Sequence, residues 1–279
     1  MPTILQLSDA HLSPRSPLFR DNLARIRALA EAVAPDLVVA TGDLSLDGAD
    51  KDDDLAFAAE LHAAFPAPLL ALPGNHDVGS HPHTMPHQPV DPARLARFHA
   101  HLGPGRGVVD LPGWRIIGLN SEVMGTGLEE EAAQAASLPG LVAAAGDRRI
   151  ALFVHKPVFV TTPDDPTFDY WSVPPSARPA LAPILDHPSL RLVGSGHLHL
   201  HHRFARGRTV FAWAPALSFV VHPHEQPGLP GERLCGALVH RLHADHVETE
   251  LLAPEGLDIP LLDDIRHLTY PHQGQRGVT

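Results

Sequence analysis

The sequence predicts an α/β fold with two β-sheets, and three observations lead to that prediction. Apolar runs alternate with helical patterns in the first half, where the order strand, helix, strand implies parallel βαβ units. The second half is richer in strands joined by short turns, which indicates antiparallel pairing and a second sheet. No linker, low-complexity tract or internal repeat divides the 279 residues. We therefore expect a single domain over residues 1–279, with a loose C-terminal tail from about residue 265.

Each expected strand is an apolar run that ends at a polar cluster or a turn. Runs such as DLVVAT and RIALFV are typical of buried strands. The expected strands span residues 3–7, 36–41, 68–72, 114–119, 149–154, 190–194, 209–213 and 235–242. Each expected helix has apolar residues at three- to four-residue spacing. The expected helices span residues 20–33, 51–65, 91–102, 129–145 and 176–187.

Composition argues against several classes of protein. The formal net charge of −11 disfavours a nucleic-acid polymer or an anionic membrane surface as the main partner. No apolar run approaches the roughly 18 residues of a membrane-spanning helix. The single cysteine, Cys235, excludes an intrachain disulfide, so we expect a cytoplasmic protein. The first residues lack the basic and apolar regions of a signal peptide, and we expect no cleaved leader.

Five of the expected strands end in residues that can bind metal ions. The stretch LQLSDAHLS places Asp9 and His11 two residues apart, and in an extended segment such residues point to the same side. The carboxyl ends of strands are where open α/β sheets place their ligands. Taken singly, each residue also fits a turn or a loop, but five concordant strand ends are improbable by chance. The full set is Asp9, His11, Asp43, Asn75, His155, His197 and His199.

These side chains suit divalent or mixed-valence ions of Mn, Fe or Zn, because the set combines carboxylate, imidazole and amide groups. Seven potential ligands are too many for one ion, and one carboxylate must bridge if two ions share them. Two ions about 3.5–4 Å apart can lower the pKa of a shared water and stabilise an in-line displacement. His76 directly follows Asn75, so we expect its side chain to face the substrate and donate a proton to the leaving oxygen.

The motifs D-x-H, GD, GNHD, a lone His and GHxH, in that order, resemble the calcineurin-like metallophosphoesterase superfamily. The chain is most similar to the bacterial branch that contains class III cyclic-nucleotide phosphodiesterases and glycerophosphodiesterases. The resemblance implies a four-layer αββα sandwich with two mixed β-sheets flanked by helices. It also implies two ions bridged by Asp43. The implied ligands are Asp9, His11 and His199 for one ion, and Asn75, His155 and His197 for the other.

Two stretches depart from relatives within that superfamily. Leu46 stands where many members carry an Asp or Asn that orients the histidine of GNH, and we expect Asp47 or Asp77 to replace it. Leu46 also replaces the metal-binding Tyr of purple acid phosphatases, and GDLSLDG lacks the arginine of protein phosphatases. The segment WAPALSF over 213–219 differs from the apolar-Pro-Ser-Thr stretch of many cyclic-nucleotide enzymes, which weakens that specific assignment.

The function expected is therefore that of a dinuclear-metal-dependent phosphodiesterase, in which a hydroxide that bridges the ions attacks a small phosphodiester. The alternatives are a phosphomonoesterase or nucleotide phosphatase at the same site, or a non-catalytic metal-binding scaffold. Substrate specificity is expected in loops 79–92, 121–131, 160–178 and 213–232. Tyr170 and Trp171 fit either an aromatic wall for the leaving group or simple loop packing, and Arg178 is expected at the surface. The sequence carries no signal for the oligomeric state.

Overall fold

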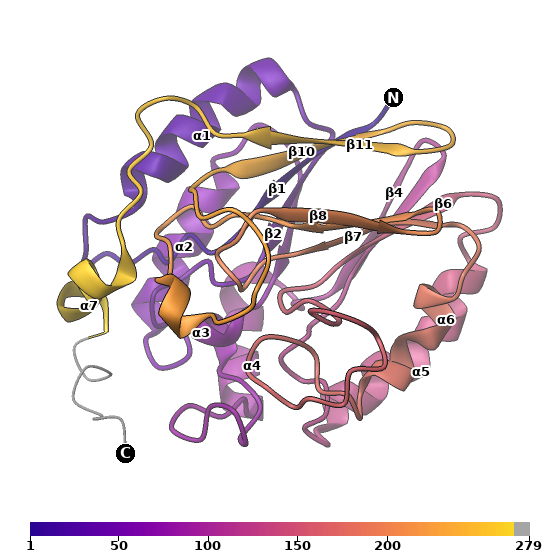
Figure 1. Ribbon diagram of the computed structural model, residues 1–279, viewed down its shortest axis with the longest axis horizontal. Helices are drawn as coiled ribbons and strands as arrows, with labels where there is room; N and C mark the ends of the chain where they lie inside the picture. The colour runs from indigo at the N-terminus through magenta and orange to yellow at the C-terminus, as the bar shows by residue number, and fades with distance from the viewer. Residues whose placement is uncertain (271–279) are drawn as a thin grey trace.

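Two mixed β-sheets lie face to face, and helices cover the outer face of each (Figure 1). The computed structural model describes residues 1–270. Its strands are β1 Thr3–Leu7, β2 Leu37–Thr41, β3 Leu69–Leu72, β4 Gly107–Leu111, β5 Trp114–Gly118, β6 Arg149–Phe153, β7 Leu190–Ser195, β8 His202–Arg206, β9 Thr209–Trp213, β10 Ala237–Leu242 and β11 Val247–Leu252. Its α-helices are α1 Arg20–Val33, α2 Asp52–Ala63, α3 Asn75–Val78, α4 Pro92–Leu102, α5 Glu129–Ala143, α6 Ala182–Leu185 and α7 Leu262–Thr269. This arrangement is the α/β fold with two mixed sheets that the sequence predicts.

The first sheet has the strand order β11-β10-β1-β2-β3. Its N-terminal strands are parallel, with Leu5 opposite Val38 and Ala40 opposite Ala71. The predicted βαβ units of the first half are thus confirmed. Strand β10 returns from the far end of the chain and pairs antiparallel with β1. Residues from both ends of the described chain therefore complete one sheet.

The second sheet has the order β4-β5-β6-β7-β9-β8. The antiparallel pairing predicted for the second half is wrong for its centre, where β5, β6, β7 and β9 run parallel. Antiparallel pairs occur only at its margins, between β4 and β5 and between β8 and β9. The connections that contain α5 and α6 give the chain the length it needs to cross over between parallel neighbours.

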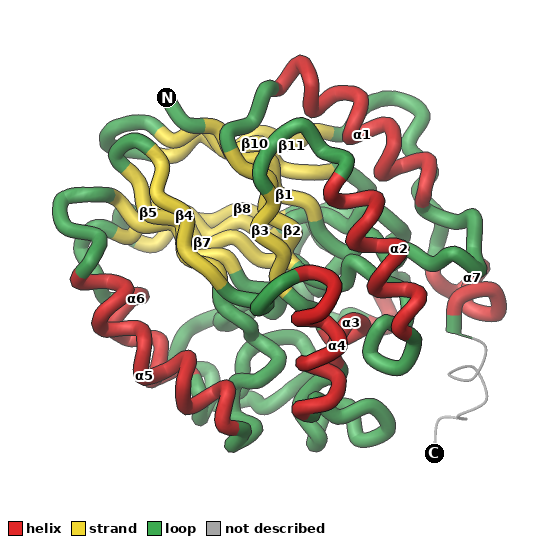
Figure 2. Tube along the Cα trace, turned by 180° about the vertical axis from the view of Figure 1, so that it is seen from behind, coloured by secondary structure: helices red, strands yellow, loops and turns green. Residues whose placement is uncertain are grey.

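Alternation along each strand builds the layers. In β1, Leu5 and Leu7 pack against α1, α2 and α4, whereas Ile4 packs between the sheets against residues such as Phe153. A separate apolar cluster joins α5 and α6 to the outer face of the second sheet through residues such as Leu152. Figure 2 shows the same layers from behind, with the yellow strands between the two sets of red helices.

Two expectations about helices require correction or comment. Residues 176–187 do not form one helix, because Pro179 and Pro183 limit it to a 3-10 turn over Arg178–Leu181 followed by the single turn of α6. The tail expected to be loose from about residue 265 begins inside α7, which continues to Thr269, and residues 271–279 lie outside the described part of the chain. No helix within residues 1–270 has the length and apolar character needed to cross a membrane.

Candidate metal centre

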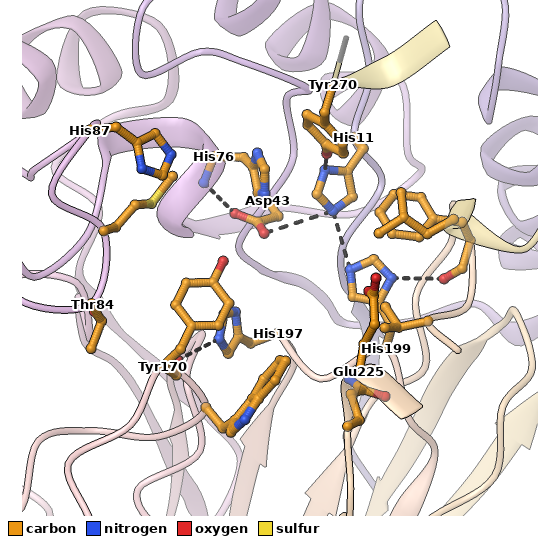
Figure 3. A pocket seen from close by; sticks show the side chains of 16 residues that line it. His11, Asp43, His76, Thr84, His87, Tyr170, His197, His199, Glu225 and Tyr270 are labelled. Atoms are coloured by element: carbon orange, nitrogen blue, oxygen red, sulfur yellow. Dashed lines mark hydrogen bonds and ion pairs between the residues drawn. The ribbon is translucent and has the colours of Figure 1, made fainter. Parts of the chain in front are cut away.

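All the predicted strand-end residues come together at one edge of the sandwich. Asp9 and His11 follow β1, Asp43 follows β2, and Asn75 follows β3, all from the first sheet. The remaining residues come from the second sheet, where His155 follows β6 and the GHLH segment with His197 and His199 follows β7. The site therefore straddles both sheets, and Figure 3 shows side chains from the two sides facing one another.

The backbone at these residues is strained. Seven residues other than glycine have a positive φ among those described, and five of them are the candidate ligands Asp9, His11, Asp43, His197 and His199, with φ between 47° and 69°. The left-handed conformation costs roughly 1–2 kcal/mol per residue, and such strain clusters at functional sites. The extended geometry expected for the D-x-H segment is thus wrong, and the GHLH segment is left-handed at His197 and His199 as well. The side chains of these segments nevertheless converge on one centre.

The side chains form two groups with Asp43 between them. Asp9, His11 and His199 form one group, in which His11 Nε2 lies 3.3 Å from His199 Nε2, and His199 Nε2 lies 3.4 Å from Asp9 Oδ1. Asp43, His155 and His197 form the other. Asn75 joins the second group, because its Oδ1 lies 3.2 Å from His155 Nε2.

Asp43 contacts both groups with the same oxygen. Its Oδ2 lies 3.4 Å from His155 Nε2 and 3.7 Å from His11 Nε2. Its Oδ1 accepts a hydrogen bond from the backbone N–H of His76 at 2.7 Å, which fixes the rotation of the carboxylate. The arrangement suits a carboxylate shared by two cations.

Each of the four histidines has one ring nitrogen engaged outside the centre. His155 Nδ1 contacts the carbonyl of Thr41 at 2.7 Å, His197 Nε2 that of Tyr170 at 2.9 Å, and His199 Nδ1 that of Phe219 at 2.7 Å. His11 Nδ1 contacts the hydroxyl of Tyr270 at 2.8 Å. Outer partners of this kind fix the tautomer of metal-binding histidines and leave the other nitrogen for the ion.

Other features also fit bound cations. Asp9 Oδ1 is buried, and no residue described by the structure donates a hydrogen bond to it. Such a carboxylate oxygen requires a partner. A Cβ at Gly74 would lie 2.2 Å from Asp43 Oδ1, and one at Gly196 would lie 2.7 Å from Asp9 Oδ2. These glycines therefore keep the space that the carboxylates occupy.

The ionisation of the centre follows from burial and close charges. Burial lowers the pKa of His11 and of His197 well below the ordinary value, so both remain neutral with a free lone pair. Burial alone would lower the pKa of His155 and raise that of Asp43. Their attraction instead raises the pKa of His155 to about 10 and holds that of Asp43 well below its usual range. A cation that binds His155 Nε2 must displace the proton from that nitrogen.

His76 directly follows the candidate ligand Asn75 and lines the cavity described below. Neither Asp47 nor Asp77, the two residues expected to orient it, contacts its ring. Its Nδ1 contacts the backbone carbonyl of Leu46 at 3.2 Å. Asp77 instead accepts hydrogen bonds from Gly74, Leu44 and Ser45 and so holds the loop after β2. Asp47 accepts a hydrogen bond from Gln88. Leu46, the residue that departs from the pattern of related sequences, therefore contacts His76 through its backbone carbonyl. The identity of the side chain at position 46 gives no indication of this contact.

A cavity of about 240 Å³ opens onto the centre. Tyr170 and Trp171 line it, which favours the aromatic-wall interpretation over simple loop packing. Phe219, Leu262 and Tyr270 line it as well. Among the described residues that line it, none is Lys or Arg, and Glu225 adds an acid.

Several supporting residues carry no motif. Phe219 packs its ring 4.3 Å from that of His199, and Ser218 Oγ donates to the carbonyl of Asp9 at 2.7 Å. Both belong to WAPALSF, which is therefore part of the support of the centre. Lys156 directly follows the ligand candidate His155. Its ammonium lies 4.9 Å from the ring centroid of Tyr170 and 3.4 Å from Glu122 Oε2.

Arg178 is buried, so its expected surface position is wrong. Its guanidinium donates to the carbonyls of Asp165 at 2.7 Å, Pro163 at 3.1 Å and Val173 at 3.0 Å. It thereby holds the loop that carries Tyr170. The role is structural, and phosphate contact is not needed to explain this arginine.

Comparisons with known proteins agree with this geometry. A family model described as calcineurin-like phosphoesterase matches residues 2–201. The chain is 30% identical over 219 residues to the 3',5'-cyclic adenosine monophosphate phosphodiesterase CpdA of Pseudomonas aeruginosa, a match that covers 73% of this chain and 72% of that protein. It is 33% identical over 131 residues to the protein of the same name from Escherichia coli K12, but that match covers 44% of this chain and only 42% of the relative.

A solved structure shares the fold. The dimetal phosphatase from Danio rerio superposes with a TM-score of 0.62 at 15% identity, over 90% of this chain and 96% of that one. The family match includes every strand-end motif from Asp9 to His199, and the fold and the paired side-chain groups agree with it. The chain belongs to the calcineurin-like phosphoesterase family.

Proposed function

We propose that this protein is a phosphodiesterase that hydrolyses small phosphodiesters at a pair of metal ions. The observation that carries the proposal is the position of Asp43 Oδ2, between His155 Nε2 at 3.4 Å and His11 Nε2 at 3.7 Å. Asp9, His11 and His199 would hold one ion, and Asn75, His155 and His197 the other, with Asp43 shared. Bound ions of this kind activate water and neutralise phosphate oxygens. Mn, Fe and Zn all suit the ligands.

His76 is the proposed general acid. The contact of its Nδ1 with the Leu46 carbonyl leaves Nε2 for the substrate, and the residue lines the cavity. Its backbone N–H, bonded to Asp43, sets its distance from the centre. From there the imidazolium would protonate the oxygen of the departing alcohol as the bond to phosphorus breaks.

The charge of the cavity favours diesters over monoesters. A monoester carries a charge of about −1.5 to −2 at neutral pH, whereas a diester carries a single negative charge. The described lining contains no Lys or Arg to balance the second charge. The aromatic side chains of Tyr170 and Trp171 would contact an apolar or planar leaving group. The relatives named as cyclic AMP phosphodiesterases support the same substrate class.

We further propose that the chain acts as one domain in the cytoplasm. A non-catalytic scaffold is the rival of an enzyme on this fold. It is disfavoured because a scaffold has no need of the complete set of candidate ligands together with His76. A phosphomonoesterase or nucleotide phosphatase is the alternative enzyme at the same site. Comparing substrates that carry one and two negative charges distinguishes it from a phosphodiesterase.

A substrate panel with defined metals tests the proposal. Chelated protein is loaded with Mn²⁺, Fe²⁺ or Zn²⁺, its metal content is measured, and it is assayed with cyclic nucleotides, glycerophosphodiesters, bis-aryl diesters and aryl monoesters. We expect two ions per chain and a higher kcat/KM for diesters. A higher kcat/KM for aryl monoesters would establish the monoesterase, and metal-loaded protein inert to the whole panel would establish the scaffold. Full turnover in the presence of chelator would exclude a metal enzyme.

A further inference from the structure

The C-terminal segment reaches the metal centre through Tyr270. This residue directly follows α7, and its N–H donates to the carbonyl of Arg266 at 2.7 Å. Its hydroxyl lies 2.8 Å from His11 Nδ1, and its ring centroid lies 4.9 Å from that of His76 (Figure 3). The segment lies beyond residues 2–201, which the family model matches. Its contribution to the site is therefore not implied by the motifs that the family model matches.

The packing of α7 fixes the position of Tyr270. The N–H of Leu262 donates to the carbonyl of Val220 at 2.9 Å, and Leu262 shares an apolar cluster with Phe19 and Phe219. Arg266 Nη2 contacts Glu225 Oε1 at 2.6 Å. Hydrogen bonds and apolar contacts thus hold the helix against the wall of the cavity. They thereby keep Tyr270 beside His11 and His76.

The partner of His11 differs in kind from those of the other three histidines. His155, His197 and His199 each use a backbone carbonyl, which stays in place whatever the side chain at that position. His11 relies on a side-chain hydroxyl that one substitution removes. For His11 Nε2 to present its lone pair to an ion, Nδ1 must carry the proton and donate it to the Tyr270 oxygen.

We propose that Tyr270 is a positioning residue for both His11 and His76, so that the C-terminal helix completes the active site. The inference rests on the proposed function for its catalytic part only. The hydroxyl sets the tautomer and orientation of His11 and so tightens one ion. The ring sets the orientation of His76 and so aids proton transfer to the leaving group. The two parts act on different measurements.

Two substitutions separate these parts. Tyr270→Phe removes the hydroxyl and keeps the ring, whereas Tyr270→Ala removes both. Leu268→Ala is the control, because Leu268 lies on α7, is 55% exposed and does not line the cavity. Tyr170→Phe is the comparison for the other ion, since its hydroxyl accepts from Asn75 Nδ2 at 2.8 Å. Each full-length chain is stripped with chelator and titrated with Mn²⁺ by calorimetry.

We expect Tyr270→Phe to weaken one of the two Mn²⁺ binding steps by about 10–100-fold, the usual effect of removing an outer partner of a ligand. Tyr170→Phe should weaken the other step, and Leu268→Ala neither. At saturating Mn²⁺, Tyr270→Phe should recover most of kcat. Tyr270→Ala should not, and its loss should be larger for an alkyl ester than for a nitrophenyl ester of the same phosphodiester.

Unchanged Mn²⁺ binding in Tyr270→Phe would overturn the role toward His11. Equal losses for both leaving groups in Tyr270→Ala would overturn the role toward His76. If Tyr270→Ala fails to fold, the Mn²⁺ calorimetry of Tyr270→Phe still tests the hydroxyl, and Tyr270→Leu replaces Tyr270→Ala in the leaving-group comparison that tests the ring. A wild-type chain that binds two ions but hydrolyses nothing would refute the proposed function, and the calorimetric result for Tyr270→Phe would still decide the contact with His11.

Discussion

Replacing Gly74 with alanine should displace the carboxylate on which the proposed centre depends. Gly74 lies between β3 and Asn75, directly against the Asp43 segment. A Cβ at this position would lie 2.2 Å from Asp43 Oδ1 and 2.4 Å from the Asp43 backbone nitrogen. Neither atom can move aside easily. The backbone N–H of His76 holds Asp43 Oδ1 in place, and the Asp43 nitrogen belongs to a buried loop.

The size of the effect follows from these distances. Real Cβ atoms keep at least 3.0 Å from such neighbours, so Asp43 or Gly74 must move by about 0.8 Å. Overpacking of this kind destabilises a protein by typically ~1–3 kcal/mol. A displacement of about 1 Å at a catalytic group costs roughly 10²-fold in rate. We therefore expect Gly74→Ala to fold, to lose ~10–100-fold in kcat/KM, and to bind metal more weakly.

Gly140→Ala is the matched control. Gly140 lies within α5, and a Cβ there would meet no atom within 4 Å. The same substitution should then leave activity unchanged and raise stability by up to ~1 kcal/mol. Thermal unfolding, Mn²⁺ calorimetry and diesterase kinetics are measured on both variants. If Gly74→Ala keeps wild-type metal affinity and rate, Asp43 is not held in the position from which its bridging role is inferred.

Three further predictions concern charge and protons. Asp43→Asn should lose at least one ion per chain and at least ~10²-fold in rate, as metal analysis and kinetics would report, because the negative charge between two cations is gone; two ions and a near-native rate would contradict it. His76→Ala should keep both ions and slow an alkyl ester by ~10²–10⁴-fold but a nitrophenyl ester much less, since nitrophenolate leaves without a proton; loss of metal would make His76 a ligand. Burial lowers the pKa of His62 to about 4 and that of His240 to about 3. Below pH 6.5 these two histidines therefore bind protons in the unfolded chain but not in the folded chain, and the stability of the fold should decrease as the pH falls. Melting temperatures measured between pH 7.5 and 5 check this trend. If a His240→Gln variant shows the same pH dependence as the wild type, His240 does not contribute to it.

The sequence predicts interior strands well and edge strands poorly. All eight expected strands occur, with ends that shift by at most two residues. The three strands that the pattern misses, β4, β8 and β11, each lie at the edge of a sheet. The segment HRFAR of β8 is mostly exposed, and VETELL of β11 alternates with charged residues. An edge strand faces water on more sides, so it needs no continuous apolar run.

In the candidate site, contributions from the strand-end side chains could be predicted from the sequence, whereas contributions from the main chain could not. The strand-end residues could be found in the sequence because carboxylates and imidazoles are visible there and their strands are apolar. The contact of the Leu46 carbonyl with His76 could not be found, because every residue has a carbonyl. Tyr270 could not be found either. It lies 259 positions from His11 in the sequence, and nothing in its neighbourhood forms a motif.

The straddling of two sheets has a consequence for the lifetime of the protein. His11 and His199 are 188 positions apart and belong to different sheets, so an ion bound by both would cross-link the two halves of the sandwich. A ligand that binds only the folded chain stabilises it by about 2.7 kcal/mol at a free concentration 100-fold above its Kd. Loss of this amount can change the abundance of a protein in a cell several-fold through degradation. Scarcity of metal would then lower the number of molecules as well as the rate of each one.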